Sequence, residues 1–67
     1  MEDFKVRLLE ERNQLKEKVE KLDLFLESET FEQLDLTLQM LMEDQFYAME
    51  HYLDSLQSRI EYLKIEE

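Results

Sequence analysis

The chain has 67 residues, lacks Gly, Pro, Cys and Trp, and carries 8 basic and 18 acidic residues for a formal net charge of −10. Without Gly or Pro, tight hairpin turns are unfavourable and a β-sheet is not expected, and without Cys, disulfides, thiolate nucleophiles and Cys-based zinc sites are excluded. The overall charge, taken alone, argues against nucleic-acid or phosphate ligands.

The first predicted helix runs from about residue 3 to residue 27. Its apolar residues recur at steps of three, four or seven and therefore share one face, which is expected to pack in the core. These residues are Phe4, Leu8, Leu15, Val19, Leu22 and Leu26. Arg12 interrupts the apolar face between Leu8 and Leu15.

A capped turn is predicted over residues 28–35. Ser and Thr hydroxyls compete for backbone hydrogen bonds, which makes these residues good caps and poor helix interiors. Thr30 followed by Gln33 fits a capping box. Asp35 is a second N-cap candidate, in which case residues 31–34 would form a separate short turn.

The second predicted helix runs from about residue 36 to residue 65. Its main apolar stripe consists of Leu38, Met42, Met49, Leu53, Leu56, Ile60 and Leu63. Further apolar side chains flank this stripe or lie opposite it, and one antiparallel partner cannot cover them all. We therefore expect one all-α domain over residues 1–67, an antiparallel helical hairpin of two long helices that assembles into an oligomeric helical bundle.

Solubility and location follow from the same composition. Hydrophobic residues make up 43% of the chain, too many for a disordered acidic tail. No apolar stretch approaches the roughly 18 residues of a membrane span. The acidic start Met1-Glu2-Asp3 is unlike the basic start of a signal peptide. We expect a soluble, cytoplasmic protein without membrane contact.

Two polar residues interrupt the apolar stripes, Arg12 on the first helix and Gln45 between Met42 and Met49 on the second. One interpretation is that each makes a buried or half-buried hydrogen-bonded contact that fixes helix register. The other is that one of them reaches a ligand.

A row of side chains borders the first apolar face, at spacings that stack them along one flank of a helix turning about 100° per residue. The row consists of Arg7, Glu11, Gln14, Lys18, Lys21 and Phe25. It is either a solvated flank or one wall of a groove between subunits, in which basic groups meet phosphates and an aromatic ring stacks on a base.

The second helix has a comparable edge, formed by Leu41, Ala48, Tyr52, Arg59 and Tyr62. Arg59 is the first basic residue after Lys21, and it requires either an intersubunit carboxylate or an anionic ligand at a symmetry axis. His51 is the single histidine and gives no metal-binding pattern. No catalytic or phosphate-loop motif is present, so we do not expect an enzyme and expect no cofactor.

The order and spacing of residues 3–63 resemble the small helical-hairpin sponges with which bacteriophages counter CBASS immunity, whose hairpin domain is also associated with Thoeris anti-defence sponges. No single motif carries the resemblance, which rests on the whole set. The set is Phe4, Arg7, Glu11, Leu15, Lys18, Leu22, Phe25, Ser28, Phe31, Leu34, Leu41, Gln45, Met49, Tyr52, Leu56, Arg59 and Ile60.

The resemblance implies a protein that binds cyclic nucleotide messengers in the host bacterial cytoplasm without cleaving them. It implies a homohexamer built as a trimer of dimers, with cyclic dinucleotide pockets between subunits and a separate cyclic trinucleotide site near the threefold axis. Cyclic ADP-ribose isomers are a further ligand class; polymeric nucleic acid is not.

By position in this pattern, Lys18 is the expected phosphate contact of the dinucleotide pocket and Phe4 the base-stacking residue. Arg7 and Lys21 are secondary contacts there. The second site is assigned to Arg59, with Tyr52 or Gln45. Its acidic surroundings weaken that assignment.

Two rival functions remain at this stage. One is an adaptor module that assembles with other proteins, and the other is an acidic mimic of DNA, in which spaced carboxylates imitate phosphates. The charge is distributed unevenly along the chain. Residues 1–21 hold six basic and six acidic residues, whereas residues 22–58 hold nine acidic residues and no Lys or Arg. The first helix is therefore free to present a local cationic groove.

Overall fold

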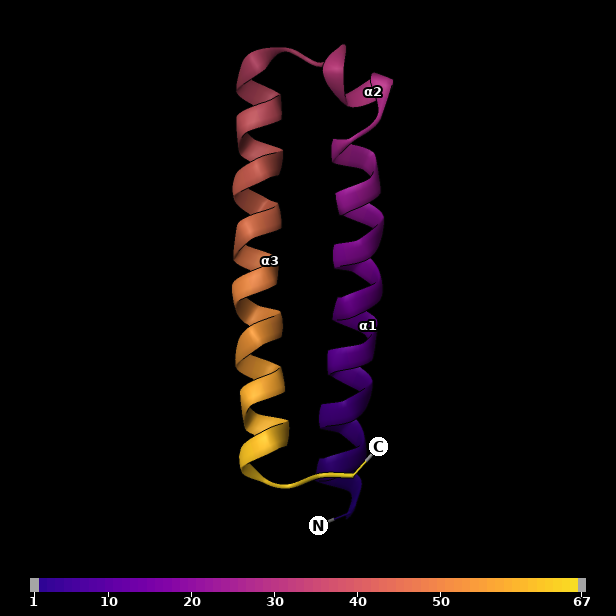
Figure 1. The fold of residues 1–67 in the computed structure, drawn as a ribbon, viewed down its shortest axis with the longest axis vertical. Helices are drawn as coiled ribbons and strands as arrows, with labels where there is room; N and C mark the ends of the chain where they lie inside the picture. Colours follow the sequence, from indigo (N-terminus) through magenta and orange to yellow (C-terminus); the bar gives the residue numbers. More distant parts are fainter. Residues whose placement is uncertain (1, 67) are drawn as a thin grey trace.

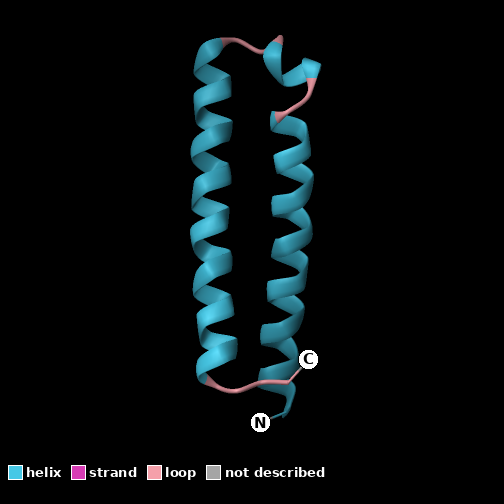
Figure 2. Ribbon diagram, viewed as in Figure 1, coloured by secondary structure: helices cyan, strands magenta, loops and turns pink. Residues whose placement is uncertain are grey.

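The computed structural model describes residues 2–66 and consists of two long antiparallel helices joined through a short one (Figure 1). Helix α1 spans Glu2–Leu26, α2 spans Glu29–Glu32 and α3 spans Leu36–Tyr62. Met1 and Glu67, the ends of the predicted domain, lie outside the described residues. Within residues 2–66 the structure contains helices and loops without strands (Figure 2), which confirms the prediction of an all-α fold with a long helix pair.

The turn between the long helices is built from two side-chain caps. The Ser28 hydroxyl accepts a hydrogen bond from the Phe31 N–H and so caps α2, and Asp35 caps α3 by accepting from the Leu38 N–H at 2.7 Å. Asp35 as an N-cap is thus confirmed. The capping box at Thr30 is wrong, because Thr30 lies inside α2 and the extended backbone that a cap requires occurs at Ser28.

Gln39 closes the turn from the α3 side. Its side-chain amide donates to the carbonyls of Phe31, Glu32 and Leu34 at 3.0–3.2 Å, so it adds hydrogen bonds to carbonyl oxygens at the end of α2 and in the loop that follows. Phe31, which is buried, also meets the Phe25 ring edge-on with centroids 6.1 Å apart. These contacts fix the closed end of the hairpin.

At the other end, α3 stops at Tyr62, three residues before the predicted limit of 65. Lys64 adopts a left-handed conformation with φ of 56°. The Ile65 N–H then bonds back to the Ile60 carbonyl and the Lys64 N–H to the Glu61 carbonyl, both at 3.1 Å. This is a Schellman motif, which usually has glycine at the left-handed position, so a lysine there could not indicate the motif in advance.

The most tightly packed part of the hairpin lies at this open end, where both described ends of the chain meet. Leu8, Leu56 and Ile60 are at most 3% exposed and form one cluster, against which Leu9, Leu15 and Ile65 pack. Ile65 belongs to this packing, and the tail that follows α3 runs toward α1 (Figure 1).

The rest of the hairpin leaves much apolar surface exposed. Leu24 and Leu36 are each 70% exposed, and Tyr47 is 64% exposed. The chain measures 47 × 15 × 14 Å and exposes 5596 Å². A compact protein of the same mass would expose about 4,600 Å². No helix among residues 2–66 is both long and apolar enough to cross a bilayer.

Candidate ligand-binding face

The row of residues on the flank of α1 is solvent-exposed over most of its length. Arg7, Glu11, Lys18 and Lys21 are all exposed. Phe25, at the closed end of the row, is half-buried because its ring packs against Phe31. Phe25 is therefore part of the turn, and stacking on a ligand would fall to Phe4, which is 50% exposed.

A hydrogen bond between the helices places the α3 edge beside this row. The Tyr52 hydroxyl donates to the Glu11 carboxylate, so the Tyr52 side of α3 and the Glu11 side of α1 form one face of the hairpin. We call this the cationic face and define it by the predicted site residues together with Glu11: Phe4, Arg7, Glu11, Lys18, Lys21, Gln45, Tyr52 and Arg59. The resemblance assigned all of these residues except Glu11 to two separate sites, and their common face could not be inferred from spacing along one helix.

The Tyr52–Glu11 bond also fixes which residues lie at the same level of the hairpin. Lys18 follows Glu11 by seven residues and Gln45 precedes Tyr52 by seven, so in an antiparallel pair both are displaced by about 10 Å toward the closed end. By the same count, Phe4 and Arg59 are both displaced toward the open end. Each end of the cationic face therefore contains residues from both predicted sites.

Basic groups dominate the cationic face. Arg7, Lys18, Lys21 and Arg59 outnumber the carboxylates of Glu11 and of Asp3, which lies one turn before Arg7. Tyr52 is 45% exposed, and its hydroxyl is hydrogen-bonded to the Glu11 carboxylate. A chain of strongly negative net charge thus presents one face on which an anion would meet several cations.

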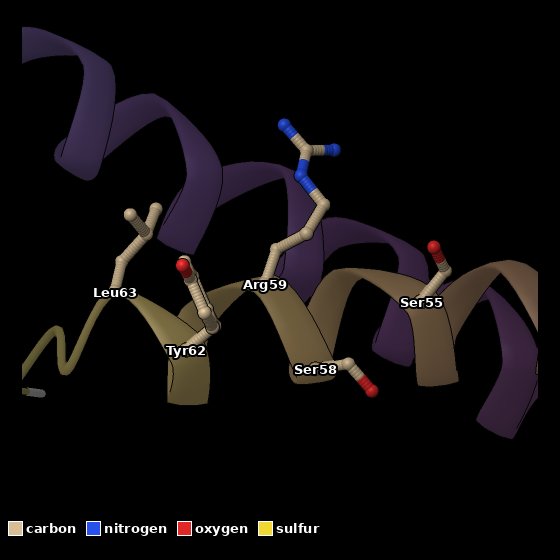
Figure 3. Close-up of a pocket in the computed structure, with 5 residues that line it drawn as sticks. All are labelled: Ser55, Ser58, Arg59, Tyr62 and Leu63. Atoms are coloured by element: carbon tan, nitrogen blue, oxygen red, sulfur yellow. The ribbon is translucent and has the colours of Figure 1, made fainter.

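Arg59 lies beside a shallow pocket of about 530 Å³ on α3, lined also by Ser55, Ser58, Tyr62 and Leu63. In the close-up, Arg59 and Ser55 extend from the same side of α3, and Ser58 points away from them (Figure 3). Ser55 and Ser58 were not among the predicted site residues. In the sequence, Ser55 precedes Arg59 by four residues and Ser58 precedes it by one. Serine is too common on exposed helices for this spacing to predict a site.

Arg12 and Gln45, the two polar residues that interrupt the apolar stripes, have different environments in the structure. Arg12 is 7% exposed; its guanidinium donates to the side-chain oxygens of Gln57 on α3 and Asn13, the latter at 2.8 Å. The interpretation of Arg12 as a buried hydrogen-bonded contact is confirmed. Gln45 is exposed and contacts the Met49 sulfur at 3.8 Å, so the same interpretation is wrong for Gln45 in the single chain.

The chemistry of the cationic face suits binding. Lys and Arg side chains form charge-assisted hydrogen bonds with phosphates, and half-exposed Phe and Tyr rings offer surfaces for bases. Phe4 and Lys18 are 14 residues apart, about 21 Å along α1. One small ligand cannot span that distance on a single chain. A pocket that uses both side chains must therefore combine them from different chains.

Comparison with known families identifies the chain. The family model for Sequestin matches residues 2–62. The chain belongs to the Sequestin family. The name of the family suggests a binding protein that sequesters its ligand, and this fits the resemblance to anti-defence sponges. No match was found among curated proteins or among solved structures.

Proposed function

We propose that this Sequestin binds and sequesters cyclic di- and trinucleotide immune messengers without cleaving them. In this role a bacteriophage protein in the host bacterial cytoplasm withholds the messenger from the effectors of CBASS-type immunity. The observation that carries the proposal is the cationic face. Four basic side chains lie with Phe4 and Tyr52 along one side of a hairpin whose formal net charge is −10.

Oligomerisation is part of the proposal, because a sponge must enclose its ligand to slow its release. The cationic face is open on a single chain. The hairpin also exposes about 1,000 Å² more surface than a compact chain of its mass, and part of the excess is apolar. Assembly into a homohexamer, a trimer of dimers, would bury apolar surface and bring Phe4 of one chain near Lys18 of another.

The residue roles follow from charge and exposure. Lys18 is proposed to contact the phosphates of a cyclic dinucleotide, Phe4 to stack on a base, and Arg7 and Lys21 to add positive charge. Arg59, with Tyr52 or Gln45, is proposed to serve a cyclic trinucleotide. Ser55, which extends from the same side of α3 as Arg59, adds a hydroxyl group to that second site.

The test is calorimetry of the purified protein against cyclic dinucleotides, cyclic trinucleotides and cyclic ADP-ribose isomers. We expect sub-micromolar binding of at least one, with the ligand recovered intact after heat denaturation. Lys18→Ala should abolish dinucleotide binding and leave the oligomer intact on sizing. Lys16→Ala is the matched control, because Lys16 is exposed on the other flank of α1.

Three results would overturn parts of this proposal. Absence of binding to the whole panel would remove the sponge function, and a converted ligand would indicate an enzyme. Dissociation of the oligomer by Lys18→Ala would make Lys18 structural. Equal loss of dinucleotide binding in Lys18→Ala and Arg59→Ala would refute two separate sites.

One observation favours a second candidate, a DNA mimic. All nine acidic residues between positions 22 and 58 are exposed, and no Lys or Arg lies among them. Spaced carboxylates of this kind can compete with phosphates for a nucleic-acid-binding protein. In that case Lys18→Ala would retain activity, whereas neutralising Glu43, Asp44 and Glu50 together would remove it.

A further inference from the structure

A second hollow, of about 360 Å³, lies at the open end of the hairpin. It is lined by Lys5, Val6 and Leu9 of α1 and by Lys64, Ile65 and Glu66 of the tail that follows α3. Lys5 and Lys18 are separated by about 140° around the α1 axis, so this hollow lies on the other flank of the helix from the cationic face.

The floor of the hollow is anchored in the core. Leu9 and Ile65 both pack against the Leu8–Leu56–Ile60 cluster, and the Ile65 N–H bonds to the Ile60 carbonyl at 3.1 Å. Packing holds the tail against the core cluster, and the backbone hydrogen bond ties it to the end of α3. The hollow is a built feature of the fold, with a half-buried apolar floor and charged side chains at its rim.

Lys64 occupies a backbone position at which a side chain is unfavourable. With φ of 56° it lies in the left-handed region, where a Cβ atom approaches the following carbonyl oxygen and where helix ends favour glycine. Lys64 in this position lines the same hollow as Lys5. The two cations come from opposite ends of the chain, and only the fold brings them together.

We propose that this hollow binds a phosphomonoester carried on a flat, weakly polar body, the chemistry of a nucleoside monophosphate. A terminal phosphate is close to doubly charged at neutral pH and suits two ammonium groups. Val6, Leu9 and Ile65 offer an apolar surface for the face of a base. The volume falls within the roughly 300–1,000 Å³ of small-molecule sites.

Glu66 narrows the choice of ligand. Its carboxylate can accept a hydrogen bond from a ribose hydroxyl or a base amine, and it opposes the additional charges of a di- or triphosphate. A cyclic phosphodiester offers one charge per phosphate and suits the hollow less well. This inference is independent of the proposed sponge function, because the two sites share no residue.

The test is calorimetric titration of the full chain with AMP, supported by titrations with adenosine and with inorganic phosphate. We expect AMP to bind with a Kd below about 1 mM, and both fragments to bind at least tenfold more weakly. Lys5→Ala and Lys64→Gly should each weaken AMP binding at least tenfold, whereas Lys16→Ala should change it less than twofold. Since glycine favours the left-handed region, Lys64→Gly should not lower the Tm.

Several outcomes would overturn the inference. These are no AMP binding by the wild type, equal weakening by Lys16→Ala, or unchanged affinity in Lys64→Gly. A lowered Tm with unchanged AMP affinity would instead make Lys64 a structural partner of the α3 carboxyl end. Lys18→Ala distinguishes the two proposals, because it should abolish cyclic dinucleotide binding and leave AMP binding unchanged.

Discussion

The buried contact between Arg12 and Gln57 gives a direct test of how the two long helices are held in register. Arg12 is 7% exposed and donates to the side-chain oxygen of Gln57, so Gln57→Leu removes an acceptor from a buried cation. Losing a hydrogen bond to a charged group lowers the free energy of unfolding by about 1.5–3 kcal/mol. For a domain of this size, a loss of about 2 kcal/mol lowers the Tm by roughly 8–16 °C.

The double variant Arg12→Leu/Gln57→Leu separates the cost of a buried charge from the value of the contact. Replacing both partners by apolar groups leaves no charge to bury, so the double variant should be more stable than Gln57→Leu alone. We expect a coupling free energy of at least about 1 kcal/mol in this cycle. Gln45→Leu, at an exposed glutamine of the same helix, should change the free energy of unfolding by less than about 0.5 kcal/mol.

The assay is thermal and urea denaturation followed by circular dichroism, at one fixed protein concentration because association shifts the Tm. The reasoning fails if Gln57→Leu unfolds within about 0.5 kcal/mol of the wild type. It also fails if the losses of the two single variants simply add in the double variant, because the contact would then carry no energy of its own.

Three further predictions concern other parts of the structure. Leu56→Ala, at the fully buried centre of the core cluster, should lower the free energy of unfolding by about 2–5 kcal/mol in urea denaturation; a loss below 1 kcal/mol would show that the site collapses around the cavity. Ser28→Ala should cost about 1 kcal/mol by the same assay, whereas Thr30→Ala should be near neutral, because Ser28 supplies the cap of α2. Glu11→Gln should strengthen cyclic dinucleotide binding in calorimetry and steepen its salt dependence, because a carboxylate leaves the cationic face; weaker binding would mean that Glu11 contacts the ligand.

The sequence predicted the two long helices well because their apolar residues repeat with the helical period. Asp35 was also predictable, since an Asp before an apolar helix is a common N-cap. The helix end at Tyr62 was not predictable, because the left-handed residue that ends the helix is Lys64, and lysine has no preference for that conformation.

The sequence identified the residues of the candidate site but not how they are arranged relative to one another. Spacing along one helix shows which residues share a flank, so the row on α1 and the edge on α3 were both identifiable. Which flank of α3 meets which flank of α1 depends on the rotation of the two helices about their axes. The wide apolar stripe of α3 is compatible with several rotations of this helix about its axis, so the sequence does not determine which one occurs. The Tyr52–Glu11 hydrogen bond shows the rotation that the structure adopts.

The hairpin is held at both ends, by the α2 turn with Gln39 at one end and by the tail whose Ile65 packs against the core cluster at the other. This arrangement constrains how the molecule can move. A helix pair joined only by a turn can slide by one residue row or splay at its free ends, as in shear and hinge motions. Here sliding would break contacts at both ends at once. We therefore expect the response of a single chain to a ligand to be confined mainly to side-chain rotation on a rigid rod.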